Sequence, residues 1–339
     1  MQKDRDPSFD AFRGLAIIAV VALHVVYLSG YWGSRFLFYC QLFDFGVPVF
    51  IFTSGYWTAK KPIRSLQDHK THLIKRLTRV LIPYFFWSSI LLGYEAIKTH
   101  DIDVQQIIFK LLTGKASFPY FFIILIAQFY VITPFLHYIN RKRYGLILVL
   151  IVNVISLLLR YLSRLHFNFW FPSVSLFYSW IIFYEIGLLV GRSDNKIFAA
   201  KKVRFFILPA LLVCLLISEL EGTIILSKYG NFGFAAHALK YSTFMYSVCI
   251  IFAFLFVREH FYHWPKLLVT IGYRSFGIYL IHVPVLTRVV RVLKETKIYS
   301  FPALYQLVVG LITISLCFLL ISITRKLLPK PFCHKVFGF

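Results

Sequence analysis

Polar stretches long enough to form a separate soluble domain are missing from this 339-residue sequence, and so are internal repeats and low-complexity tracts. One domain covering residues 1–339 is therefore expected, and its chemistry must come from residues inside or beside that domain. Acidic residues are scarce as well, since 14 Asp and Glu stand against 37 Lys and Arg and leave a formal charge of +23. Such a charge is typical of nucleic-acid-binding or membrane proteins.

Cysteine usage excludes two further classes of protein. The sequence has five cysteines, an odd number, and four of them lie within or beside apolar segments, where a thiol behaves as a small hydrophobe: Cys40, Cys214, Cys249 and Cys317. Neither a disulfide framework nor the spacing of metal ligands is visible. We therefore expect no metal.

Apolar residues dominate what is present. They make up 59% of the sequence, at a mean hydropathy of +0.72, which is more apolar surface than a soluble core of this length buries. Segments of about twenty apolar residues predict membrane-spanning helices. They predict an all-α transmembrane bundle of about ten helices, over residues 11–31, 36–57, 79–97, 119–137, 144–159, 173–190, 205–220, 237–257, 271–293 and 302–323.

Short basic loops alternate with these spans, which favours membrane orientation over nucleic-acid binding as the reason for the positive charge. With the N-terminus in the cytoplasm, the basic stretches 60–79, 141–143, 192–204, 258–274 and 325–335 all fall on the cytoplasmic side. Both termini are then cytoplasmic. Lys3 and Arg5 before the first apolar run also fit a signal peptide, but the many later spans favour an uncleaved helix. Short connections favour a bacterial inner membrane.

One segment between the third and fourth spans differs from the others. Residues 99–117 begin with polar residues and then place Ile107, Ile108, Leu111 and Leu112 at helical spacing. This pattern predicts an amphipathic helix on the outer surface.

The first span carries a polar stripe. Arg13 and His24 are eleven residues apart, so at about 100° per residue their side chains point in nearly the same direction, and Asp10 precedes Arg13 by one turn. In a purely structural interpretation, Asp10 and Arg13 form an ion pair that anchors the helix, and His24 forms a hydrogen bond with a neighbouring helix. A functional interpretation gains support from Asp44, which lies at a similar depth in the next span and could orient the imidazole.

Two more groups stand out among the later spans. Arg76 and Arg79 lie one turn apart at the cytoplasmic mouth of the third span, which suits either membrane anchoring or phosphate binding. Tyr279 and His282 share a helix face, where a satisfied core histidine is the plain alternative. Glu185 is a further buried acid, for which the sequence suggests only a role as partner to one of these cations.

Four motifs in this order resemble the membrane-bound acyltransferase family 3. They are the Arg13 and His24 pair; Gly46, Phe50, Ser54 and Gly55 in the second span; Arg76 and Arg79 before Pro83 and Tyr84; and Tyr279 with His282. Together the motifs bracket nearly the whole chain. The middle spans, from about residue 119 to 257, carry little of the family's signature.

The resemblance implies an O-acyltransferase that uses cytoplasmic acetyl-CoA or another acyl-CoA. The donor's phosphates are expected near Arg76, Arg79 and Arg13, with Ser54 also on the donor side. His24, with Arg13 and Asp44, is expected to do the chemistry, either as a base on the acceptor hydroxyl or through an acyl-histidine.

On the acceptor side, the resemblance implies a surface glycan or lipid-linked sugar that enters from outside, while Tyr279, His282 and Asp10 position the substrates. A polysaccharide exporter or flippase is the alternative, because a ten-helix bundle with polar midplane residues suits either purpose. No inverted repeat supports the alternative.

Overall fold

The computed structural model describes residues 6–31, 33–60, 66–100, 103–140, 142, 144–167, 169, 171–172, 174–192, 203–261 and 263–339. Several residues of the predicted basic loops and spans lie outside the described residues: Lys3, Arg5, Lys61, Arg64, Arg141, Arg143, Ser173, Lys196, Lys201 and Lys202. The described chain is built from helices, turns and bends, so the predicted all-α class is confirmed.

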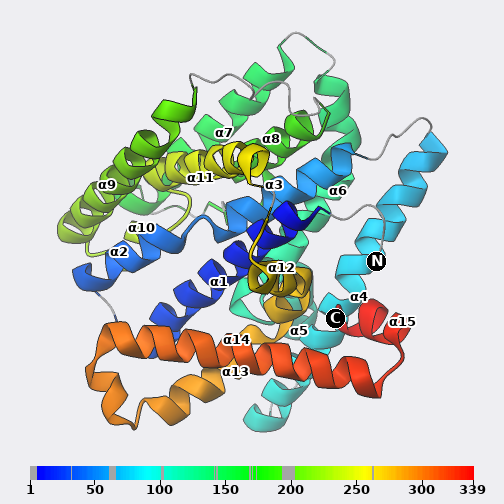
Figure 1. Cartoon of the computed structure of the whole chain (residues 1–339), viewed down its shortest axis with the longest axis vertical. Helices are drawn as coiled ribbons and strands as arrows, with labels where there is room; N and C mark the ends of the chain where they lie inside the picture. Colours follow the sequence, from blue (N-terminus) through cyan, green and yellow to red (C-terminus); the bar gives the residue numbers. More distant parts are fainter. Residues whose placement is uncertain are drawn as a thin grey trace.

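Helices cross the molecule in several directions around a central α1 (Figure 1). The longer ones are α1 (Pro7–Ser29), α2 (Ser34–Phe43), α3 (Gly46–Ala59), α4 (Leu66–Thr99), α5 (Val104–Thr113), α6 (Phe121–Ile139), α7 (Gly145–Tyr161), α8 (Ile181–Arg192), α9 (Val203–Tyr229), α11 (Tyr241–His260), α12 (Lys266–Tyr273), α13 (Ser275–Leu293) and α14 (Pro302–Leu327). Short helical turns are η1 (Phe118–Tyr120), η2 (Leu162–His166), η3 (Phe177–Ser179), α10 (Phe232–Ala235), η5 (Lys297–Ser300), α15 (Lys330–Phe332) and η6 (Cys333–Phe337).

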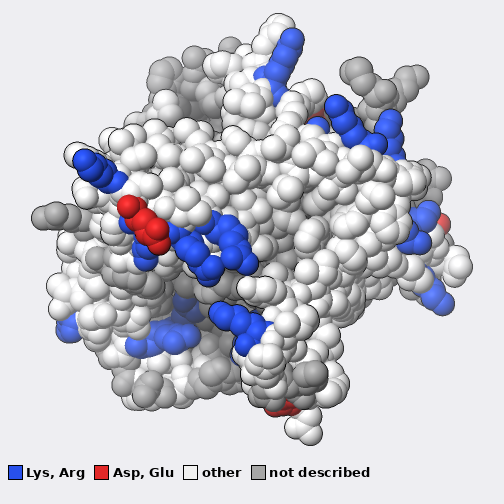
Figure 2. All heavy atoms as spheres, turned by 90° about the horizontal axis from the view of Figure 1, so that it is seen from below, with Lys and Arg blue, Asp and Glu red and all other residues white. Residues whose placement is uncertain are grey.

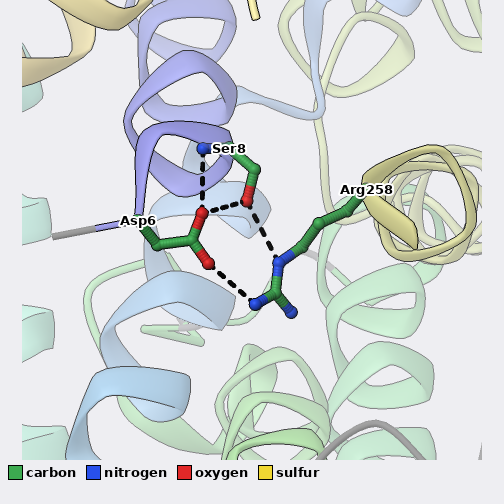
Figure 3. Close-up of polar contacts among 3 residues, drawn as sticks. All are labelled: Asp6, Ser8 and Arg258. Atoms are coloured by element: carbon green, nitrogen blue, oxygen red, sulfur yellow. Dashed lines mark hydrogen bonds and ion pairs between the residues drawn. The ribbon is translucent and has the colours of Figure 1, made fainter. Parts of the chain in front are cut away.

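A side-chain cap and a proline begin α1. The carboxylate of Asp6 accepts a hydrogen bond from the backbone N–H of Ser8 at 2.9 Å, and Pro7 occupies the first turn, where its missing N–H costs nothing. Arg258, at the end of α11, donates to the other oxygen of Asp6 at 2.7 Å and to the Ser8 hydroxyl at 3.1 Å (Figure 3). The start of α1 and the end of α11 therefore lie at the same end of the bundle.

Within the described residues, nine helical segments are long and apolar enough to cross a membrane. The chain is thus a multi-pass membrane protein, as predicted. The one predicted span that differs is 173–190, where the structure has η3 and the 12-residue α8. At 1.5 Å per residue α8 extends about 18 Å, well short of an apolar layer of about 30 Å.

Close backbone packing fixes the direction of this short helix. A Cβ built on Gly187 would lie 2.2 Å from the carbonyl oxygen of Phe52, and one on Gly191 would lie 2.7 Å from Cβ of Ala59. Residue numbers therefore rise together along α3 and α8, so the two helices are parallel and end side by side. Lys60, after α3, and Arg192, at the end of α8, therefore lie at the same end of the bundle.

Two of the predicted spans are interrupted. The second is divided into α2 and α3, which continue in roughly the same direction (Figure 1) with Asp44 and Phe45 between them. Pro48 lacks an N–H, so the carbonyl of Asp44 loses the helical donor four residues on. The ninth is divided at Arg274 into α12 and α13.

The surface agrees with a membrane protein. Figure 2 shows wide areas without any charged side chain, while Lys and Arg side chains gather in separate groups with few acids beside them. The segment predicted as an amphipathic helix contains α5, whose first turn is capped by the Asp103 carboxylate at 3.0 Å from the N–H of Gln106. Its helical conformation is confirmed.

Candidate active site

Two histidines from opposite ends of the chain meet in the interior. The ring centroids of His24, on α1, and His282, on α13, lie 5.1 Å apart, and Phe118 places its ring edge-on to His24 at 5.4 Å. His24 is 9% exposed and His282 is fully buried. The sequence predicted each of these imidazoles as functional separately, but it did not place them together.

The proton of His282 is located by its hydrogen bond. Its Nδ1 lies 2.7 Å from the carbonyl oxygen of Tyr279, and because a carbonyl only accepts, Nδ1 carries a proton. The neutral ring then has its lone pair on Nε2, which is buried and has no hydrogen-bond partner among the described residues. His282 therefore presents a free basic nitrogen in the protein interior.

Two tyrosine hydroxyls hold α13 around this histidine. Tyr279 donates to the carbonyl of Pro119, and Tyr120 donates to the carbonyl of Leu280 at 2.6 Å. The second bond is required by the sequence of α13, because Pro284 cannot donate to Leu280 and leaves that carbonyl without its helical partner. The short helix η1 and the middle of α13 are thus joined at two points in the turn that precedes His282.

Asp10 and Arg13, two residues of the predicted polar stripe on α1, lie in contact. Arg13 and Asp10 form an ion pair at 2.5 Å, with Asp10 buried and Arg13 partly exposed. Helix α12 packs unusually closely here, since a Cβ built on Gly272 would lie 1.6 Å from the carbonyl oxygen of Asp10. Only a glycine fits at that contact.

Arg76 and Arg79 lie in different surroundings despite being one turn apart. Arg76 donates to the carbonyl of Trp57 at 3.0 Å and to the Thr58 hydroxyl, and its guanidinium lies over the Tyr130 ring at 5.2 Å. The Tyr130 hydroxyl in turn accepts a hydrogen bond from the hydroxyl of Ser54 at 3.2 Å. Ser54 and Arg76 therefore belong to one network between α3, α4 and α6.

Arg79 instead lines a surface groove of about 630 Å³, together with residues of the C-terminal segment. It forms no hydrogen bond or ion pair with any residue that the structure describes. The two arginines were predicted as a pair of phosphate ligands, and the structure gives them separate positions.

Asp44 lies with a lysine rather than with His24. Its electrostatic neighbour is Lys240, a fully buried side chain just before α11, and the hydrogen bonds and ion pairs of the described residues include none between Asp44 and His24. One carboxylate oxygen of Asp44 is buried without a hydrogen-bond partner. The structure thus brings His24 together with His282, and Asp44 together with Lys240.

Lys240 is part of a polar network that sequence analysis missed. Its ammonium donates to the carbonyl of Ser218 at 3.0 Å and interacts electrostatically with Glu219 and Glu221. Glu221 also accepts hydrogen bonds from Tyr161 and from the N–H of Ser242. The available signal was the pair of acids at the end of the predicted span 205–220, where ionisable groups are costly.

Glu185 has a partner as well. It is fully buried on α8, and its carboxylate accepts a hydrogen bond from the Asn140 side chain at 2.5 Å. Its surroundings also include Arg192, at the end of the same helix. Glu185 therefore stabilises the contact between α6 and α8, away from the two histidines.

Fold and site together define a multi-pass helical membrane protein whose predicted site residues, Asp44 apart, lie on α1, α3, α4 and α13. The acyltransferase domain of family 3 matches residues 6–322, which is nearly the whole sequence. The chain belongs to the acyltransferase family 3, as the four motifs indicated, and this membership implies acyltransferase activity. No curated protein and no solved structure matches the chain.

Proposed function

We propose that this protein moves an acyl group, preferably acetyl, from cytoplasmic acyl-CoA to a hydroxyl of a sugar or polysaccharide outside the cytoplasm. The observation that carries the proposal is the pair of imidazoles, 5.1 Å apart between ring centroids, in the interior of an acyltransferase-family bundle. A pair of imidazoles inside a membrane protein contributes little to its stability, because buried polar groups are costly there.

His24 acts as the general base. It takes the proton of the acceptor hydroxyl while the hydroxyl oxygen attacks the thioester carbonyl, the C–S bond breaks, and the proton passes to the sulfur of the departing CoA. Tyr279 and His282 position the substrates beside it. Transfer through an acyl-histidine is the second route. An imidazole nitrogen attacks the thioester carbonyl, the C–S bond breaks and CoA leaves as the thiol; the hydroxyl oxygen then attacks the acyl-imidazole, the C–N bond breaks, and the hydroxyl proton returns to the imidazole.

The donor enters at the end of the bundle that carries the arginines. Phe9, in the first turn of α1, stacks on Tyr56 at 4.1 Å, and Arg76 bonds the next residue, Trp57. The Asp10 and Arg13 pair and the Arg76 network therefore share one end. We place both termini on that side, with α8 and the irregular residues before it together making the tenth crossing, and the positive-inside rule then makes this side cytoplasmic, in a bacterial inner membrane.

Purified protein in lipid vesicles tests the proposal. Labelled acetyl-CoA is supplied on one side and candidate glycan acceptors on the other, and transfer of label to the glycan that depends on His24 supports the enzyme. Movement of the sugar without CoA, with no acyl transfer, would instead support the exporter. Mass spectrometry of cell-surface glycans with and without the gene identifies the acceptor.

A further inference from the structure

The groove beside Arg79 joins two parts of the chain that are distant in sequence. One wall is α4, with Lys75, Arg79 and Ile82, and the other is the C-terminal segment, residues 330–335, with Lys330, His334 and Lys335. The family match ends at residue 322, so the second wall lies beyond the region that the family match covers.

Contacts of Phe337, two residues beyond the C-terminal segment, hold that segment against α4. The indole N–H of Trp87 donates to the carbonyl of Phe337 at 3.2 Å, and Phe86 packs its ring against that of Phe337 at 4.9 Å between centroids. Cys333, within the segment, is itself buried. Aromatic packing therefore fixes the wall, independently of the charges that it carries.

The charges themselves oppose this arrangement. Lys75, Arg79, Lys330 and Lys335 all line the groove, and no acidic residue does. None of the four side chains forms an ion pair or hydrogen bond with another part of the described chain. Like charges held together without a counter-charge are unfavourable, so the groove suits a ligand with several negative charges.

Phosphate is the chemistry that fits these side chains. The planar guanidinium of Arg79 can bind two phosphate oxygens at once, and lysines supply point charges around it. In a CoA-dependent acyltransferase, the ligand with several phosphates is the donor. We propose that the groove binds the phosphates of acyl-CoA and that Lys330, His334 and Lys335 form the half of this site that the family's arginine motif does not supply. This inference rests on the proposed function.

The test uses the full chain in detergent and in vesicles, with free CoA as the probe. The double variant Lys330→Ala/Lys335→Ala should weaken CoA binding about tenfold or more, because each charge-assisted bond contributes roughly 1.5–3 kcal/mol. The affinity for dephospho-CoA, which lacks the ribose phosphate, should fall less in the double variant than the affinity for CoA does. The matched control is Lys294→Ala/Lys297→Ala, which removes the same charge from exposed positions elsewhere and should bind CoA like the wild type.

The other possible outcomes show whether the inference or the proposed function is wrong. If the wild type binds CoA and the double variant binds it equally well, the inference fails while the proposed function stands. If the wild type binds no CoA, both fail. Anionic lipid is the other source of phosphate, so vesicle binding is compared with and without phosphatidylglycerol. Loss of lipid binding with unchanged CoA affinity would assign the groove to lipid and overturn the inference.

Discussion

His24 and His282 face each other across the interface of α1 and α13, with ring centroids 5.1 Å apart and their planes tilted by 35°. Neither ring forms an ion pair with an acid among the described residues. The arrangement differs from a histidine oriented by a carboxylate, since the neighbour of each imidazole is another imidazole. The proton of His282 is fixed by a backbone carbonyl, which leaves its Nε2 able to accept.

Replacement of His24 should remove acyl transfer without unfolding the protein. His24→Ala eliminates the base, so we expect kcat to fall by about 10²- to 10⁴-fold. Turnover of labelled acetyl-CoA by the purified variant measures this, and an unchanged elution volume in gel filtration shows that the fold is kept. Turnover at the wild-type rate would contradict the mechanism.

The variant His282→Asn tests the role of Nε2 separately from that of Nδ1. The asparagine side chain can still donate to the Tyr279 carbonyl, as Nδ1 does, but it lacks a counterpart of Nε2. We expect the variant to keep its melting temperature and to lose most of its kcat, with little change in the KM for the donor. A normal kcat would show that Nε2 takes no part and that His282 is a core residue.

Much of this site could be predicted from single helices, and the rest depends on packing. The Asp10 and Arg13 pair follows from helical spacing alone, and the structure contains it. The meeting of His24 with His282 could not be predicted, because spacing within a helix does not say which helices are neighbours. For the same reason Asp44 was paired with the histidine one span away, whereas its neighbour is Lys240.

The lengths of the helices could also be predicted only in part from the sequence. Hydropathy located nine of the crossing segments, but α8 was predicted as a full span because the apolar residues before it were counted as helix. Apolar composition reports burial, and residues 174–180 are buried or half-buried without being α-helical. Composition alone could not distinguish a short buried helix with an irregular lead-in from a complete span.

The hydrogen bond from Tyr120 to Leu280 predicts a rescue experiment. Tyr120→Phe leaves the Leu280 carbonyl buried and unpaired, at a cost of about 1–3 kcal/mol. Pro284→Ala returns a backbone N–H that can reach this carbonyl, so it should restore stability in the Tyr120→Phe background. Melting temperatures in detergent for the two single variants and the double variant give the coupling, and additive effects would refute the pairing.

The Lys240 network makes a separate prediction about charge. Lys240→Met removes the donor to the Ser218 carbonyl and the cation near Asp44, so we expect the free energy of unfolding to fall by about 1–3 kcal/mol. Adding Asp44→Asn should recover part of that loss, because the buried carboxylate that has lost its nearby cation is then replaced by a neutral amide. Unfolding in denaturant measures both variants.

Asp44→Asn alone also tests the predicted coupling to His24. The structure places Asp44 with Lys240, so we expect the single variant to lower stability. A changed titration of the His24 ring, followed by NMR, would support the coupling to His24. Full activity with an unchanged titration would mean that Asp44 has no catalytic role.

Contact between α1 and α12 limits what residue 272 can be. A Cβ on Gly272 would lie 1.6 Å from the carbonyl oxygen of Asp10, so Gly272→Ala must push α12 away from the Asp10 and Arg13 pair. We expect lower stability and lower activity together. The control is Gly310→Ala on α14, where nothing lies within 4 Å of the added carbon and alanine favours the helix by about 1 kcal/mol. Equal melting temperatures for the two variants would show that the contact at Gly272 is looser than the structure has it.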